Sequence, residues 1–168
     1  YNLTLNVTDV PCANSSSGVI QTNVSGADNP LSFSWSGPNG FTSNTQNIGD
    51  LGIGQYCLNF SDATGCLTQL CEFVELGTPA QPIFTFTQNP RPSCPSATNG
   101  GLDVNVTGLS GNLTYSWTGP GGYTSNQQNI TGLIGGQYSL TVTDGFGCTY
   151  NSQTSLVPFT TSNAVLSF

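Results

Sequence analysis

The sequence lacks lysine, histidine and methionine, and Arg91 is its one basic residue. Proteins that bind nucleic acid draw most of their affinity from Lys and Arg contacts with phosphate, so this class is excluded. Attraction to an anionic membrane surface fails for the same reason. No apolar run approaches the ~20 residues that a membrane-spanning helix needs. We therefore expect neither nucleic acid nor a membrane among the partners of this chain, whose net charge is −7.

These absences also limit enzyme chemistry. Without histidine or lysine, the Ser-His-Asp, Cys-His, Ser-Lys and Schiff-base arrangements cannot be assembled. A glycosidase needs two facing carboxylates. Among the eight acidic residues, Asp62 and Asp144 alone occupy equivalent positions, and we expect them to lie a domain apart. The chain is predicted not to be an enzyme, with no catalytic residue and no cofactor-binding residue.

A shift of 82 residues aligns the sequence with itself without a gap. Phe33–Asn44 falls on Tyr115–Asn126, and Leu51–Tyr56 falls on Leu133–Tyr138. Between Cys12 and Val74, about two in five positions are identical to their counterparts. The sequence therefore predicts two equivalent structural units.

The same register gives the expected boundaries. The two units are predicted at residues 1–75 and 83–157, with a linker at 76–82. Residues 158–168 are predicted to be a second linker and the first strand of a third unit. Because the chain starts at Tyr1 without a signal peptide, we expect it to be an excerpt or a processed product of a longer array.

Short segments rich in Thr, Val, Leu and aromatic residues alternate with clusters of Gly, Pro, Asn and Asp, which is typical of strands and turns. No segment shows a helical period. The fold class is predicted to be all-β, as two tandem, disulfide-stapled immunoglobulin-like β-sandwich domains. The strands expected in the first unit are Asn2–Thr8, Val19–Ser25, Leu31–Ser36, Gln55–Ser61 and Leu67–Val74.

The two-residue period of a strand also predicts the core. Leu31, Phe33 and Trp35 share one face, so Trp35 and its counterpart Trp117 are expected inside. The motif Leu-x-x-Gly-Gln-Tyr resembles the tyrosine corner of immunoglobulin-like domains, in which a Tyr hydroxyl bonds to nearby backbone. The tyrosines of the two copies, Tyr56 and Tyr138, are expected to be core residues.

Six cysteines are present, and their positions in the repeat suggest three disulfides. Cys12 and Cys66 recur as Cys94 and Cys148, which favours the pairs Cys12–Cys66 and Cys94–Cys148. Cys57 and Cys71 are replaced together, by Ser139 and Gln153, so we expect them to pair. A hairpin turn at Ala63–Gly65 places them directly opposite each other, within disulfide reach. Disulfides imply an oxidising compartment, so the chain is expected to be extracellular, at the cell surface or secreted.

Two further features are candidate sites. Asp62 and Asp144, each in the motif Asp-x-x-Gly-Cys, could bind calcium through a turn carboxylate. The favoured interpretation is that each closes its own turn by an Asx hydrogen bond, so that no metal site is predicted. Phe41 and Tyr123 follow Gly-Pro-x-Gly and are the candidate surface contacts, for example with glycans, although the favoured interpretation is that each ring covers the edge of its sandwich.

The motifs Trp-Ser-Gly-Pro-Asn-Gly-Phe-Thr-Ser, Gln-Asn-Ile, Leu-x-x-Gly-Gln-Tyr and Asp-x-x-Gly-Cys follow one another within Leu31–Leu67, and they recur in the same order within Leu113–Thr149, where the first reads Trp-Thr-Gly-Pro-Gly-Gly-Tyr-Thr-Ser. Together they resemble the SprB-type repeat of very large surface proteins in Bacteroidetes. The resemblance implies an Ig-like module of a secreted filament or a gliding adhesin, exported by a type IX pathway. Cys57 departs from the family, in which this position carries a β-branched residue or Ser.

The leading hypothesis is a structural segment of an extracellular repeat-array filament, stalk or adhesin on a bacterial surface. Its expected partners are neighbouring repeats of the same chain and other copies in a filament. One alternative is a carbohydrate- or surface-binding module that uses Phe41 and Tyr123. A second alternative is a set of spacer domains in a secreted hydrolase.

Overall fold

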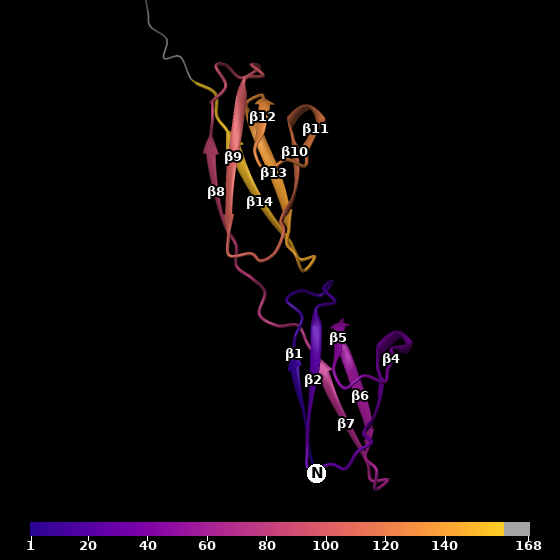
Figure 1. Ribbon diagram of the computed structural model, residues 1–168. Coiled ribbons are helices and arrows are strands. Elements are labelled where there is room, and N and C mark those ends of the chain that lie inside the picture. Colours follow the sequence, from indigo (N-terminus) through magenta and orange to yellow (C-terminus); the bar gives the residue numbers. More distant parts are fainter. Residues whose placement is uncertain (160–168) are drawn as a thin grey trace, which may run out of the picture. The chain divides into compact units, whose positions relative to one another are not determined.

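The computed structural model describes residues 1–159, and the chain divides into two compact units (Figure 1). Unit 1 consists of Tyr1–Pro79 together with Phe146–Cys148, and unit 2 consists of Ala80–Gly145 and the chain from Thr149 onward. The fold is all-β, and the helical pieces within residues 1–159 are two 3-10 turns, each of three residues. The expected first strand of a third unit lies outside the described residues.

Unit 1 contains two antiparallel sheets. One sheet has three strands in the order β1-β2-β5, and the other has four strands in the order β4-β3-β6-β7. The 3-10 turn η1, Pro38–Gly40, connects β3 to β4. The strands are β1 Asn2–Thr8, β2 Gly18–Ser25, β3 Ser32–Ser36, β4 Thr42–Ser43, β5 Ile48–Leu51, β6 Gly54–Ser61 and β7 Leu67–Val74.

Unit 2 repeats this arrangement with the sheets β12-β9-β8 and β11-β10-β13-β14. Its 3-10 turn η2, Pro120–Gly122, again follows the strand that carries the buried tryptophan. The strands are β8 Ile83–Gln88, β9 Gly100–Thr107, β10 Thr114–Gly119, β11 Tyr123–Ser125, β12 Ile130–Leu133, β13 Gly136–Thr143 and β14 Thr149–Leu156.

Each unit has a core of its own between its two sheets. In unit 1, Trp35, Leu58 and Phe60 are buried, while Ser32 and Ser34 on the opposite face of β3 are exposed. This is the alternation expected for a sheet that has one face toward the core. Trp117, Tyr56 and Tyr138 are also buried. The remaining core residues are Val10, Ile20, Ile48, Leu51 and Val74 in unit 1, and Leu102, Val104, Ile130, Leu133, Leu140, Val142 and Leu156 in unit 2.

The two buried tyrosines hold the entry to β6 and β13. The Tyr56 hydroxyl donates to the Gly52 carbonyl at 3.2 Å, and the Tyr138 hydroxyl donates to the Ile134 carbonyl at 3.0 Å. Burial raises the pKa of both hydroxyls above its ordinary value, which keeps them protonated as donors. In each unit the bond spans four residues, the local geometry expected from the Leu-x-x-Gly-Gln-Tyr motif.

The glycine of the Gly-Pro motif is required by the same tyrosine. A Cβ atom at Gly37 would lie 2.5 Å from the Tyr56 ring, and one at Gly119 would lie 2.4 Å from the Tyr138 ring. No larger residue fits at this position without moving a buried ring. The recurring Trp-x-Gly-Pro string therefore has a packing cause in both units.

A Gln-Asn pair completes the short edge of the three-stranded sheet. Gln46 Nε2 donates to the Thr22 carbonyl at 2.8 Å, and the Thr22 N–H donates to Asn47 Oδ1 at 2.9 Å. These two side chains satisfy the backbone of β2 where its pairing with β5 ends. The same bonds form in unit 2 between Gln128, Asn129 and Val104.

Candidate functional site

The cysteines of each unit occupy its two opposite ends, which decides how they can be crosslinked. Cys12 lies in the connection between β1 and β2. Next to it, the Val10 N–H donates to the Glu75 carbonyl at 3.1 Å, and the Gly77 N–H donates to the Val10 carbonyl at 2.8 Å. The connection that carries Cys12 therefore lies beside the C-terminal end of β7.

Cys66 lies at the other end of β7, directly before its first residue, Leu67. β7 has eight residues, and at about 3.3 Å per residue it spans about 25 Å. The Cα atoms of a disulfide lie at most about 7 Å apart. Cys12 and Cys66 of one unit therefore cannot bond to each other.

Unit 2 has the same arrangement. The Gly135 N–H donates to the Pro95 carbonyl at 3.2 Å, which places the neighbouring Cys94 at the start of β13 and the end of β14. Cys148 directly precedes Thr149, the first residue of β14. Cys94 and Cys148 are thus also separated by the length of an eight-residue strand.

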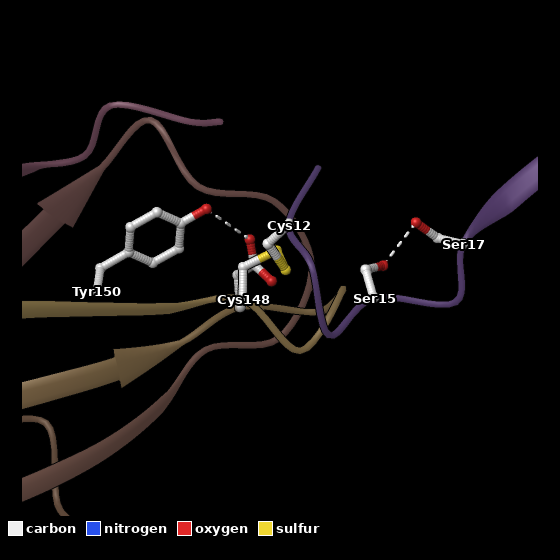
Figure 2. Close-up of a disulfide and its surroundings, with 6 residues drawn as sticks. Cys12, Ser15, Ser17, Cys148 and Tyr150 are labelled. Atoms are coloured by element: carbon white, nitrogen blue, oxygen red, sulfur yellow. Dashed lines mark hydrogen bonds between the residues drawn. A yellow bond between two sulfur atoms is a disulfide. The ribbon is translucent and has the colours of Figure 1, made fainter. Parts of the chain in front are cut away.

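The structure pairs Cys12 with Cys148, with an S–S distance of 2.14 Å and a Cα–Cα distance of 5.7 Å. Figure 2 shows this bond beside the Ser15–Ser17 hydrogen bond of the Cys12 loop and the hydroxyl of Tyr150. The pairing replaces the expected Cys12–Cys66 and Cys94–Cys148 bonds. The physical reason for this correction is the distance along β7 and β14.

Cys57 and Cys71 form the second disulfide, with their Cα atoms 4.0 Å apart. They lie directly opposite each other in the register of β6 and β7. This is the pair expected from the hairpin turn and from the joint replacement of both residues in unit 2. The two cysteines have a sequence separation of 14, and on the chain-entropy model the closure of so short a loop stabilises by about 3 kcal/mol.

Two cysteines carry free, exposed thiols in the described part of the chain, namely Cys66 and Cys94. Cys66 is in the β6–β7 turn, and Cys148 holds the equivalent place in the β13–β14 turn. Cys94 is in the β8–β9 connection, the place that Cys12 holds in unit 1. Sequence reasoning had assigned a partner to each of them within its own unit.

Of the two candidate calcium carboxylates, Asp62 closes its own turn by the expected Asx hydrogen bond, and Asp144 accepts a hydrogen bond from a tyrosine. The Thr64 hydroxyl and N–H donate to Asp62 Oδ1 at 2.6 and 3.0 Å. The hydrogen bond from the Thr64 side chain lowers the pKa of Asp62. Asp144 is buried, and the Tyr150 hydroxyl donates to its Oδ2 at 3.4 Å. Residues 1–159 contain no cluster of three or more side chains of the His, Cys, Asp or Glu type that could hold a metal ion.

The candidate surface aromatics, Phe41 and Tyr123, are half-buried in the structure. Phe41 packs edge-to-face on Tyr56 with the ring centroids 5.3 Å apart, and Tyr123 packs on Tyr138 at 5.7 Å. Such a pair stabilises by about 0.5–1.5 kcal/mol beyond the burial of its area. Each ring therefore covers the corner tyrosine of its own unit.

No protein-family model matches the chain, and no curated protein sequence matches it. The resemblance to SprB-type repeats thus depends on the sequence motifs. Within the described residues, no helix has the length and apolar character that crossing a membrane requires.

Proposed function

We propose that this chain is a structural segment of an extracellular filament, stalk or adhesin made of immunoglobulin-like, SprB-type repeats. The observation that carries the proposal is the Cys12–Cys148 disulfide, which closes 136 residues of chain. The bond joins Cys12, in the β1–β2 connection, to Cys148, in the β13–β14 turn. Such a crosslink suits a chain that carries load along its length.

The force path supports this role. When the chain is pulled from its ends, tension passes from Cys12 through the disulfide to Cys148. The strands between these two residues are then excluded from the covalent path that bears the load. A small sandwich with a modest core gains resistance to extension in this way without a larger core.

Features of each unit support the immunoglobulin-like assignment. Seven strands in two antiparallel sheets enclose a tryptophan and a tyrosine whose hydroxyl bonds to backbone a few residues upstream. Immunoglobulin-like sandwiches share these features. The short strands β4 and β11 pair with the strands that carry the tryptophans.

Two observations support a location outside the cytosol. Structural disulfides persist in oxidising compartments, and the structure contains two of them. The one basic residue, Arg91, is followed by Pro92, so trypsin-like proteases find no good cleavage site. A fibre exposed to extracellular proteases benefits from such a sequence.

The carbohydrate-binding alternative is less well supported. A sugar platform needs an aromatic ring with a free face, whereas Phe41 and Tyr123 pack against core tyrosines. A glycan array with the two-unit chain tests this alternative directly. Binding that is lost in a Phe41→Ala, Tyr123→Ala double variant would favour it over the structural role.

The proposed function is tested by immunogold labelling of the bacterium that produces the protein, with an antibody raised against the folded two-unit chain. We expect label on intact cells, arranged along filaments or at a distance from the outer surface. Antibody that has been adsorbed with the purified chain serves as the control. Labelling that requires permeabilised cells would contradict the proposal.

A further inference from the structure

The two free cysteines, Cys66 and Cys94, occupy the same two places in the repeat as the two cysteines of the Cys12–Cys148 disulfide. We name Cys12 and Cys94 the loop cysteines, because they lie in the β1–β2 and β8–β9 connections. We name Cys66 and Cys148 the turn cysteines, because they lie in the β6–β7 and β13–β14 turns. The Cys12–Cys148 bond joins a loop cysteine to a turn cysteine. One loop cysteine and one turn cysteine remain.

The free loop cysteine has the local backbone of the bonded one. The Ser15 N–H donates to the Cys12 carbonyl at 3.0 Å, and the Ala97 N–H donates to the Cys94 carbonyl at 3.1 Å. Both cysteines therefore open a turn of the same kind. Cys94 is exposed, so its thiol can be reached by a partner.

The free turn cysteine also matches its bonded counterpart. Gly65 before Cys66 has φ +78°, and Gly147 before Cys148 has φ +81°. This left-handed conformation favours glycine and sets the direction in which the next residue leaves the turn. Cys66 is exposed as well. Cys94 and Cys66 thus have the same local backbone geometry as Cys12 and Cys148, which form the long disulfide.

We propose that Cys94 forms a disulfide with Cys66 of a second copy of this two-unit segment, head to tail. A loop cysteine then joins the turn cysteine of the unit that follows, as Cys12 joins Cys148. This crosslink extends the proposed function and rests on it in one respect, since it requires the oxidising compartment proposed above. The partner copy is either a separate chain or a further repeat pair in a longer one, since both present the same thiol.

The bond forms by thiol–disulfide exchange with a small disulfide oxidant such as oxidised glutathione. The Cys94 thiolate attacks the oxidant and releases one glutathione thiol. The Cys66 thiolate of the partner then attacks the mixed disulfide and releases the second. The two protein thiols lose two electrons and two protons in total, and the oxidant becomes two thiols.

A contact of this type joins two different surfaces, so it leaves one free loop cysteine and one free turn cysteine at the ends of every product. Heterologous contacts that do not close into a ring produce open assemblies. Self-complementary pairing of Cys66 with Cys66, or of Cys94 with Cys94, would instead stop at dimers. The proposal therefore predicts the connectivity as well as the presence of a crosslink.

The experiment oxidises two single variants of the two-unit chain with oxidised glutathione. Cys66→Ser keeps only the free loop cysteine, and Cys94→Ser keeps only the free turn cysteine. We expect a 1:1 mixture to give a mixed dimer in at least about tenfold excess over either homodimer. The unsubstituted chain is expected to form a ladder of multimers on non-reducing gels. Peptide mass mapping must show Cys66 joined to Cys94, with Cys12–Cys148 intact.

A tandem chain that links two copies of the segment distinguishes the source of the partner. A Cys94–Cys66 bond formed in the tandem but not between separate chains assigns the role to repeats of one chain. A Cys94–Cys66 bond that forms both in the tandem chain and between separate chains shows that either can supply the partner thiol. A statistical mixture of dimers, an intrachain Cys66–Cys94 bond in the monomer, or no bond in either arm overturns the proposal. None of these tests depends on where the protein is located, so their failure is distinct from failure of the proposed function.

Discussion

Replacement of Cys12 by serine removes the long disulfide and should change how far the chain extends under force. In the oxidised chain, held by its two ends, the 136 Cα–Cα steps that separate Cys12 from Cys148 in sequence cannot be pulled out. In the Cys12→Ser variant they can, except for the 14 steps that the Cys57–Cys71 bond still spans, which leaves 136 − 14 = 122 steps. At about 3.6 Å per extended residue, the variant should gain about 440 Å of contour length.

The measurement is single-molecule force extension with handles at both termini, under non-reducing conditions. The variant is expected to show the unfolding of both units, whereas the parent chain shows extension only of the segments outside the disulfide. Because the bond is covalent, the parent result should not depend on the pulling rate. Equal contour lengths in the two chains would refute the assigned pairing.

Cys94→Ser is the matched control. Cys94 has a free thiol in the described structure, so this variant should extend no further than the parent chain. If Cys94 were instead bonded to Cys148, the same substitution would release the 54 Cα–Cα steps that separate them in sequence, or about 190 Å. The control therefore separates the two possible connectivities in one series of experiments.

Two further predictions concern stability. Thr22 Oγ1 is buried without a hydrogen-bond partner among the described residues, and Val104 stands at the equivalent position of unit 2. Thr22→Val should therefore stabilise unit 1 by about 1 kcal/mol, or about 4–8 °C in the melting temperature, and Val104→Thr should destabilise unit 2, both measured by calorimetry. The hydrogen bond from Thr64 lowers the pKa of Asp62 in the folded chain. The ionised Asp62 carboxylate therefore stabilises the folded state at pH values above the unfolded pKa. This stabilisation is lost as the pH falls through the lowered pKa of the folded state. An NMR titration should give a midpoint for Asp62 below 3.8, and Thr64→Val should move it upward.

The strands and the core faces could largely be predicted from the sequence, because both depend on local pattern. The alternation around Trp35 places that residue inside, and it is buried. The strands β4 and β5 were missed. β5 consists of four residues and contains Gly49 and Asp50, the latter with φ +55°, and these residue types are depleted in strands. Pairing with the edge of β2 outweighs that local preference.

The roles of Asp62 and Tyr56 also follow from local sequence. An Asx turn and a tyrosine corner each involve residues within four positions of one another. Such bonds can be anticipated before any strand is placed in a sheet. A position for Phe41 and Tyr123 over the edge of the sandwich was the favoured interpretation, but the rings on which they pack are set by the fold of each unit.

The prediction of the long-range disulfide pairing was wrong for a different reason. The 82-residue register states which cysteines are equivalent, but it does not state which equivalent cysteines are partners. Pairing within each unit and pairing between a loop cysteine and the next turn cysteine obey the register equally well. What separates them is the end of the unit at which the β1–β2 connection lies. That placement depends on β1 running beside β7 from the Tyr1–Thr68 hydrogen bond to the parallel bridge between Val10 and Leu76.

Once that packing is known, the length of one strand decides the chemistry. β7 holds Cys66 at one end and faces the Cys12 connection at the other, about 25 Å away. Two cysteines at opposite ends of such a sandwich cannot form a disulfide with each other. Each must bond to a cysteine outside its own sandwich or remain a thiol. Because β7 has eight residues, its length favours disulfides to cysteines outside the sandwich that contains it.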